Sequence, residues 1–292
     1  MTAVRLSTIL KKANKNKYAI AGLVVLCWED ALAYTQAADE TGIPIILQAG
    51  PSCRAHIPIP ILGKMFRYLA EQTKVPICCH IDHGFSLKEC KEGMDNGFTS
   101  VMYDGSKLSL SKNINNTSKI AKLAKSYKIS LEGEVGIVGN HNGRISEGTN
   151  LIDAKKFANE SGVDAMAISV GNTHLQTSKI AKIDINKIKN IQNVTKIPLV
   201  LHGSSGISYQ MRKKIASHTN VAKFNIGTEL RMIAGNSLRK NINHNRKMFD
   251  RLQLIQPTII KIKNQTKKVI RNIGIRNEKS MRFYWRQWAI RS

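Results

Sequence analysis

Short apolar runs recur along the chain, and most of them are continuous rather than alternating with polar residues. Such runs, rich in β-branched residues, are typical of strands that are buried on both faces of a parallel sheet. The eight predicted strands cover Ala19–Val25, Ile45–Gln48, Val75–Ile81, Ser100–Tyr103, Ser130–Val135, Ala165–Ser169, Pro198–Leu201 and Ala222–Ile226.

Amphipathic stretches with helical spacing separate these strands. The predicted helices include Trp28–Thr41, Ser86–Asn96, Ser109–Tyr127, Asp153–Ser161 and Ser208–Ser217. We expect Ser86 and Ser208 to be N-caps and Gly97 to stop a helix at its C-terminal end.

The alternation of eight strands with helices predicts an α/β fold, a closed (β/α)8 TIM barrel. An open, doubly wound sheet is the alternative. The first predicted strand is not followed by the pattern G-x-G-x-x-G, however, so a dinucleotide site is unsupported.

Polar residues gather at the ends of the predicted strands, and in a parallel barrel those ends form the active-site face. His83 and His202 end the third and seventh strands, and His174 follows the sixth. Three imidazoles that converge on one point form a catalytic zinc site with an open position. Zinc in such a site can act as a Lewis acid on a carbonyl oxygen. We therefore predict that these three histidines bind one Zn²⁺.

Carboxylates flank the predicted zinc ligands. Asp82 could shuttle the proton of a substrate hydroxyl or, alternatively, orient a histidine. His80, two residues earlier, is expected to face the same way and to support the ligands from behind. Asp104 and Glu134 could hold a second divalent ion or a displaced zinc, or they could pair with Lys107 or another cation.

Two small polar segments follow the seventh and eighth strands, and each precedes a helix. Glycine lets the backbone approach an anion, and N–H groups at helix starts favour phosphate. These two loops are also where barrels often bind phosphate. The predicted substrate-binding residues are Gly203, Ser204, Ser205, Asn225, Ile226, Gly227 and Thr228.

These residues resemble the class II fructose-bisphosphate and tagatose-bisphosphate aldolases over most of the chain. The matching motifs are His80–Gly84, Val101–Ser106, Leu131–Gly136, His174, His202, Gly203–Ser205 and Asn225–Thr228. In order and context, these motifs are together specific to that family.

The resemblance implies a zinc-dependent aldolase that reversibly cleaves fructose 1,6-bisphosphate or tagatose 1,6-bisphosphate. The products would be dihydroxyacetone phosphate and glyceraldehyde 3-phosphate. Asp82 would be the catalytic acid/base, and Gly203–Ser205 with Asn225–Thr228 would bind the dihydroxyacetone phosphate half. A monovalent cation near the phosphate and a homodimer or homotetramer are also implied.

Four positions depart from the family pattern. Glycine is usual where this chain has Leu175 and Ser204, and asparagine is usual where it has Val24. The loop after the fifth strand usually carries adjacent acids, and here only Glu147 is a candidate. These changes preserve the metal chemistry but leave the substrate open, so a different phosphorylated ketose is the alternative.

Charge and cysteine content bear on partners and location. The 292-residue chain has 45 Lys and Arg against 20 Asp and Glu, a formal net charge of +25. Such an excess favours anionic partners such as sugar phosphates. Five scattered cysteines indicate a reduced, cytoplasmic protein, and the sequence contains no apolar run long enough to predict a membrane span.

We divide the chain into a barrel over residues 1–276 and a basic, aromatic tail over residues 277–292. In the tail, Met281, Tyr284, Trp285 and Trp288 would share one face of a helix. The barrel would then have a C-terminal helical extension that docks on it or on a partner subunit. Alternatively, the same pattern could lie on an anionic membrane surface or bind nucleic acid. Because the tail lies outside the aldolase motifs, we expect it to be dispensable for chemistry.

Two other functions are compatible with parts of the sequence. A catalytically inactive barrel could bind nucleic acid through its basic surface, but the intact Asp82 and three histidines make a nucleic-acid partner unexpected. A Schiff-base aldolase could use Lys223, although that lysine lies in the middle of a predicted strand with no second supporting motif.

Overall fold

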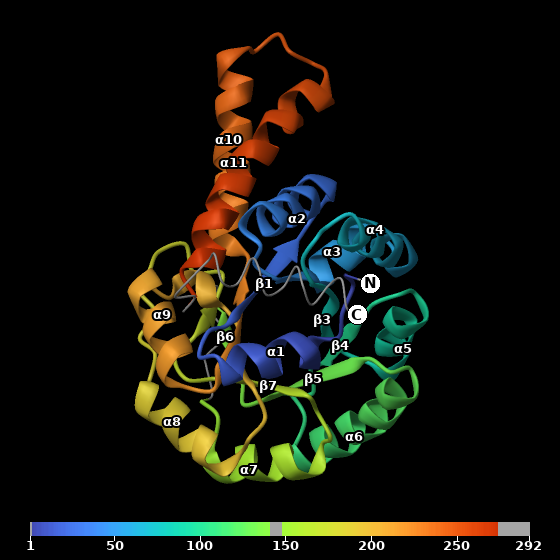
Figure 1. Ribbon diagram of the computed structural model, residues 1–292, viewed down its shortest axis with the longest axis vertical. Helices are drawn as coiled ribbons and strands as arrows, with labels where there is room; N and C mark the ends of the chain where they lie inside the picture. Colours follow the sequence, from blue (N-terminus) through green and yellow to red (C-terminus); the bar gives the residue numbers. More distant parts are fainter. Residues whose placement is uncertain (1, 141–147, 274–292) are drawn as a thin grey trace.

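A closed barrel of eight parallel strands, surrounded by helices, forms the body of the protein (Figure 1). The computed structural model describes residues 2–140 and 148–273, so the predicted tail and Glu147 lie outside the described residues. Around the barrel the strands follow the order β1-β10-β9-β7-β5-β4-β3-β2. The predicted TIM barrel is therefore confirmed.

All eight predicted strands are present, with small differences at their ends. The barrel strands are β1 (Ile20–Val25), β2 (Ile45–Ala49), β3 (Ile77–Gly84), β4 (Ser100–Tyr103), β5 (Ser130–Val135), β7 (Ala165–Ile168), β9 (Leu199–Leu201) and β10 (Val221–Ile226). Two short strands, β6 (Gly139–Asn140) and β8 (Thr173–His174), pair with each other outside the barrel sheet. β3 runs beyond its predicted end, which has consequences for the site.

The five predicted helices are present as α2, α5, α6, α7 and α9. The helices are α1 (Leu6–Lys15), α2 (Trp28–Thr41), α3 (Pro51–His56), α4 (Ile59–Glu71), α5 (Leu87–Asp95), α6 (Leu110–Ser126), α7 (Leu151–Glu160), α8 (Ile185–Val194), α9 (Tyr209–His218), α10 (Thr228–His244) and α11 (Arg251–Arg271). The predicted N-caps are confirmed, since Ser86 accepts from the N–H of Glu89 and Ser208 from that of Met211. Gly97 follows α5 with φ 88°, a left-handed conformation that suits glycine.

Helix α1 closes the end of the barrel opposite the predicted site. Leu6, Ile9 and Leu10 of α1 are fully buried against residues of the strand interior, such as Ile20 and Cys78. Figure 1 views the barrel from this end, with α1 lying across its centre. The buried apolar plug leaves only the C-terminal ends of the strands open to a ligand.

Successive side chains along β1 and β3 point alternately to the outside and to the inside of the barrel. Leu23 and Ile81 point outward into the apolar layer between strands and helices. Val24 and Asp82, at the neighbouring positions, line the cavity at the strand ends. The barrel therefore aims its inward polar residues at one opening.

Helices α10 and α11 form a hairpin that projects from the barrel beside α2 (Figure 1). The connection between them carries Phe249, whose side chain is 95% exposed. No helix in residues 2–140 and 148–273 combines the length and apolar character that a membrane span requires. All five cysteines are free thiols.

Candidate active site

The three predicted zinc ligands come together at the open end of the barrel. The ring centroids of His83 and His202 lie 4.6 Å apart, and His174 lies 5.4 Å from His83 and 5.7 Å from His202. Nitrogen atoms of all three rings lie within 4.8 Å of one another. The rings come from β3, from β8 and from the residue after β9, three segments that only the closed barrel brings together.

A bulge at the end of β3 turns His83 into the site. The register of β3 against β4 shifts between Ile81 and Gly84, so two residues of β3 face one of β4. His83 has φ 53°, in the left-handed region that non-glycine residues seldom adopt. In a regular strand Asp82 and His83 would face opposite sides, but the bulge lets both side chains reach the cavity.

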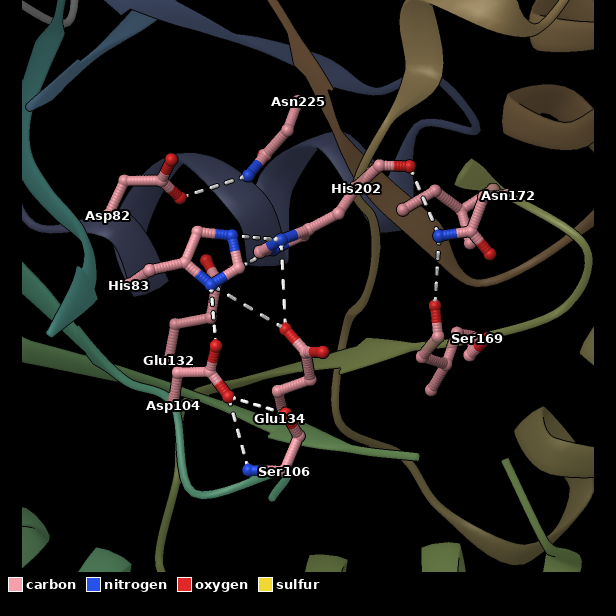
Figure 2. A network of polar contacts seen from close by, with 12 residues as sticks. Asp82, His83, Asp104, Ser106, Glu132, Glu134, Ser169, Asn172, His202 and Asn225 are labelled. Atoms are coloured by element: carbon pink, nitrogen blue, oxygen red, sulfur yellow. Dashed lines mark hydrogen bonds and ion pairs between the residues drawn. The ribbon is translucent and has the colours of Figure 1, made fainter. Parts of the chain in front are cut away.

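Hydrogen bonds orient two of the three predicted ligands, His83 and His202. Asp104 lies 2.8 Å from Nδ1 of His83, and Glu132 lies 3.0 Å from Nε2 of His202 (Figure 2). The remaining nitrogens, His83 Nε2 and His202 Nδ1, face each other at 3.0 Å. Two ligands of a tetrahedral zinc stand about 3.3 Å apart, from bonds of about 2.0–2.1 Å. A small shift would therefore admit the ion, so the residues fit a metal.

Glu132 links this cluster to a charged network inside the barrel. Its second carboxylate oxygen accepts from Lys223 Nζ at 2.6 Å, and both side chains are fully buried. His80 lies beside them, 3.4 Å from Lys223 and 2.9 Å from the hydroxyl of Ser100. Burial and the neighbouring Lys223 lower the pKa of His80 to about 3, so this ring is neutral at pH 7. His80 thus lies behind the ligands, as predicted.

Asp104 and Glu134 form a second group of possible metal ligands together with His83. Oxygen Oε2 of Glu134 is buried without a hydrogen-bond partner, and burial together with Asp104 raises the pKa of Glu134 to about 8. Asp104 accepts from His83 and from Ser106, and no ion pair with Lys107 is found among the described residues. Because both groups use His83, a metal in the second group would take the nitrogen that Asp104 now holds.

Asp82 lies beside the histidines, at the wall of the same cavity. Its side chain is only 5% exposed, and Asn225 donates to one carboxylate oxygen at 3.1 Å. Burial tends to raise the pKa of this carboxyl, but the nearby basic groups, led by His83, outweigh burial and lower the pKa to about 2. Asp82 is therefore ionised at neutral pH and can accept a proton.

The predicted phosphate loops form another wall of the cavity, which holds about 300 Å³. Ser205 Oγ accepts from the N–H groups of Gly227 and Glu229 at the start of α10, which joins the two loops. Gly203 has φ 60°, and a Cβ there would collide with the carbonyl of Thr173. The cavity is lined by Gly203, Ser205, Asn225, Gly227 and Thr228 of the predicted set.

The other two predicted substrate-binding residues turn their side chains away. Ser204 is fully buried and donates to the carbonyl of Leu201, while its own carbonyl accepts from the buried Arg212. Ile226 belongs to the apolar core. Their side chains cannot contact a ligand in the cavity, because alternation along β10 turns Ile226 outward to the apolar layer and the turn after β9 buries Ser204.

The backbone conformation at Leu175 explains why glycine would suit the position after His174. Its φ is 61°, a left-handed conformation that disfavours any residue with a Cβ. The side chain is 37% exposed at the cavity wall, so little packing offsets the backbone strain.

Comparisons with known proteins agree with this geometry. The sequence matches the family described as Fructose-bisphosphate aldolase class-II over residues 4–278. The chain belongs to this family. The aldolase is therefore a carbon–carbon lyase on a TIM barrel.

Relatives of the aldolase carry more than one substrate name. It is 29% identical over 286 residues to the 6-phospho-5-dehydro-2-deoxy-D-gluconate aldolase of Shouchella clausii, covering 95% of this chain and 97% of that protein. It is 27% identical over 304 residues to the fructose-bisphosphate aldolase of Helicobacter pylori, covering 94% and 99%. The solved YdjI aldolase from Escherichia coli K12 superposes with TM-score 0.82 at 26% identity, covering 93% and 97%.

For three residues of the aldolase site, the sequence alone indicated either no role or a different role. Glu132 and Lys223 stand two positions before Glu134 and Asn225, so strand alternation alone places them on the inward face. For Lys223, the sequence alone suggested only the role of a Schiff-base lysine. Arg231, which also lines the cavity, carried no signal beyond its position one helical turn after Thr228.

Replacing Lys223 by methionine should strongly destabilise the aldolase. The change leaves the buried carboxylate of Glu132 without its cation, and breaking a buried ion pair costs about 3–5 kcal/mol. The measurement is the free energy of unfolding of the metal-free protein in urea. Lys91→Met is the matched control, because its ion pair with Asp95 is exposed and exposed ion pairs contribute little to stability. Equal losses in both variants would contradict the role given to the buried pair.

Replacing Leu175 by glycine should stabilise the aldolase by about 1 kcal/mol or less. Relief of the left-handed strain exceeds the entropy that glycine adds to the unfolded chain. The same urea titration measures it, and Leu175→Ala, which keeps the Cβ, should show no gain. A glycine variant that is no more stable than the alanine variant would remove backbone strain from the explanation.

Proposed function

We propose that the protein is a zinc-dependent ketose-bisphosphate aldolase. Its reaction is the reversible cleavage of fructose 1,6-bisphosphate or tagatose 1,6-bisphosphate into dihydroxyacetone phosphate and glyceraldehyde 3-phosphate. The observation that carries this proposal is one cavity that joins three converging histidines, the ionised Asp82 and the two loops before α9 and α10. A relative in Helicobacter pylori is named a fructose-bisphosphate aldolase.

The histidine cluster would hold the zinc. His83 would bind through Nε2 and His202 through Nδ1, since Asp104 and Glu132 accept from their other nitrogens, with His174 as third ligand. Such hydrogen bonds to carboxylates orient metal-binding histidines. Bound zinc supplies a Lewis acid for the substrate carbonyl. Asp104 and Glu134 form a second position for a divalent ion or a displaced zinc.

Asp82 would take the proton from the substrate hydroxyl at the bond that breaks. As the hydroxyl oxygen becomes a carbonyl, the carbon–carbon bond breaks and its electron pair stays with the dihydroxyacetone phosphate half, which is then protonated. Asn225 donates to Asp82 and holds one carboxylate oxygen. The second oxygen is therefore the one that faces the substrate.

The phosphate of the dihydroxyacetone phosphate half would bind at the start of α10. Gly203 lets the loop approach closely, and the Ser205 hydroxyl and the Thr228 side chain lie at the cavity wall. Helix N-termini attract anions, and since the N–H groups of Gly227 and Glu229 already donate to Ser205 Oγ, the N–H of Thr228 would be the one offered here. Glu229 is held away by Arg212 and Lys179, so its charge is compensated. A monovalent cation beside this phosphate stays a prediction of the family resemblance.

A second substrate follows from the wall near β1 and β2. Val24, Leu26 and Gly50 offer no side-chain hydrogen-bond donor to the aldehyde half. Relatives in Shouchella clausii and Halalkalibacterium halodurans are named 6-phospho-5-dehydro-2-deoxy-D-gluconate aldolases. Ser52 and Arg231 also line the cavity and can donate, so a different phosphorylated ketose is the runner-up substrate class.

The two competing interpretations have less support. Lys223 is locked in a buried ion pair and does not line the cavity, which disfavours Schiff-base chemistry. A barrel that only binds nucleic acid would not require the cluster of His83, His174 and His202 beside Asp82. The homodimer or homotetramer, the cytoplasmic location and the dispensable tail stay predictions.

Removal of metal should abolish activity. Treatment with EDTA should eliminate cleavage, and stoichiometric Zn²⁺ should restore it, in a screen of fructose 1,6-bisphosphate, tagatose 1,6-bisphosphate and 6-phospho-5-dehydro-2-deoxy-D-gluconate. Full activity after complete chelation would overturn the metal-dependent mechanism, and zinc-loaded protein inactive on all three substrates would overturn the proposed substrates.

Replacing Asp82 by alanine should lower kcat by about 10²–10⁴-fold, the usual contribution of a general acid or base. Zinc content and the circular dichroism spectrum should stay unchanged, because Asp82 lies beside the ligands without being one. Asp95→Ala, an exposed carboxylate on α5, is the control and should keep full turnover. Near-normal kcat in the Asp82 variant at saturating substrate would exclude it from proton transfer.

A further inference from the structure

Two buried side-chain amides, those of Gln48 and Asn225, have polar atoms that the proposed reaction does not use. Gln48 of β2 is fully buried, and neither its amide oxygen nor its amide nitrogen has a hydrogen-bond partner within residues 2–140 and 148–273. Asn225 of β10 is 5% exposed, and its Oδ1 also has no partner among these residues. A buried polar atom without a hydrogen bond costs free energy, and native proteins usually satisfy it.

The side chain of Gln48 reaches across β1 toward Asn225. The two residues belong to the strands on either side of β1, where Gln48 pairs with Val24 and Asn225 pairs with Gly22. A Cβ placed on Gly22 would collide with Oε1 of Gln48 and would lie 2.9 Å from Oδ1 of Asn225. Glycine is therefore needed at position 22 to leave room for the Gln48 amide. Both amide oxygens converge on this one point.

Asn225 also contacts the proposed proton acceptor. Its Nδ2 donates to Oδ1 of Asp82 at 3.1 Å (Figure 2). The oxygen and nitrogen ends of an amide have nearly the same shape, so hydrogen bonds rather than packing decide which end faces which neighbour. If the Asn225 amide turned by 180°, its oxygen would face the ionised carboxylate and repel it. A donor beside Oδ1 of Asn225 would exclude that orientation.

Gln48 is well placed to supply this donor. Rotation of its terminal amide by 180° exchanges Oε1 and Nε2 at little cost in packing, and an N–H group then lies beside Oδ1 of Asn225. Two neighbouring residues do not offer an alternative. Lys223, two positions before Asn225 on β10, is held in its ion pair with Glu132, and Val24 has no polar side-chain atom.

We propose that Gln48 is a positioning residue, whose amide donates to Asn225 and thereby keeps the Asn225 N–H directed at Asp82. The proposal rests on the proposed function for the role of Asp82 as proton acceptor. Gln48 itself does not line the cavity, whereas Asn225 and Asp82 do. Loss of the Gln48 amide should therefore slow turnover more than it weakens substrate binding.

A double-mutant cycle on the zinc-loaded protein tests whether Gln48 acts through Asn225. Gln48→Met keeps the length of the side chain and removes both polar atoms. It should lower kcat about 3–10-fold, the range for one hydrogen bond, with a smaller change in KM. In an Asn225→Ala background the same substitution should change kcat less than about twofold, because no amide remains to be positioned. Gln192→Met is the matched control, since it removes an amide that accepts from the N–H of Asn220 at α8, and it should leave kcat unchanged.

A second readout does not require turnover. The side-chain N–H signals of Asn225 in a nitrogen-15 correlation spectrum of the metal-free protein are assigned by their loss in Asn225→Ala. Their exchange with water should be about 3–10-fold faster in Gln48→Met and unchanged in Gln192→Met. Gln48→Leu repeats both measurements in case the methionine variant folds poorly.

Three results would overturn the proposal: unchanged exchange in a folded Gln48 variant, equal losses of kcat in the two backgrounds of the cycle, or a rise in KM without a loss of kcat. Faster exchange of the Asn225 signals in Gln48→Met, in a protein whose zinc-loaded wild type cleaves none of the screened substrates, would support the contact between the two amides and refute the proposed reaction.

Discussion

The carboxylate of Glu132 connects the interior of the barrel to its chemistry. It is completely buried, yet it lies within hydrogen-bonding distance of Lys223 on one oxygen and of His202 on the other. A charge in such a place is tolerated only when its partners are well placed, so the barrel must close accurately enough to bring β5, β9 and β10 together. The same accuracy orients His202 toward His83. The barrel closure that brings these three strands together is therefore the same closure that positions the predicted ligand histidines.

Backbone conformation supplies the second constraint on the site. His83 and Leu175 adopt left-handed conformations next to the place where the three imidazoles meet. Such conformations persist only where the surroundings impose them, and they cluster at functional sites. At His83, the bulge gives neighbouring residues access to one cavity, so that the proposed proton acceptor Asp82 and the proposed metal ligand His83 face the same space. At Leu175, the strained backbone has no comparable structural consequence that would explain it.

The sequence predicted the barrel well because its strands are continuous apolar runs that no other element imitates. It also placed His83, His174 and His202 together, because strand ends meet at one face of a parallel barrel. The helix α1 and the hairpin of α10 and α11 were not predicted, since amphipathic spacing alone does not show where a helix packs. Arg231 and the pairing of Glu132 with Lys223 depend on side chains meeting across the barrel, and spacing along the chain does not encode such distances. The outward direction of Ile226 follows from alternation along β10 and could have been predicted from Asn225, whereas the burial of Ser204 depends on the turn after β9.

The two halves of the cavity differ in the kinds of group that they can bind. The loops before α10 offer a phosphate the start of a helix, whereas the wall of β1 and β2 is mostly apolar, with Ser52 as its polar residue.

X-ray absorption at the zinc edge tests the central claim most directly. The account predicts a first shell containing three imidazole nitrogens at about 2.0–2.1 Å, with one imidazole lost from the shell in His202→Ala. A zinc shell made mainly of carboxylate oxygens, or one that does not change in that variant, would contradict it.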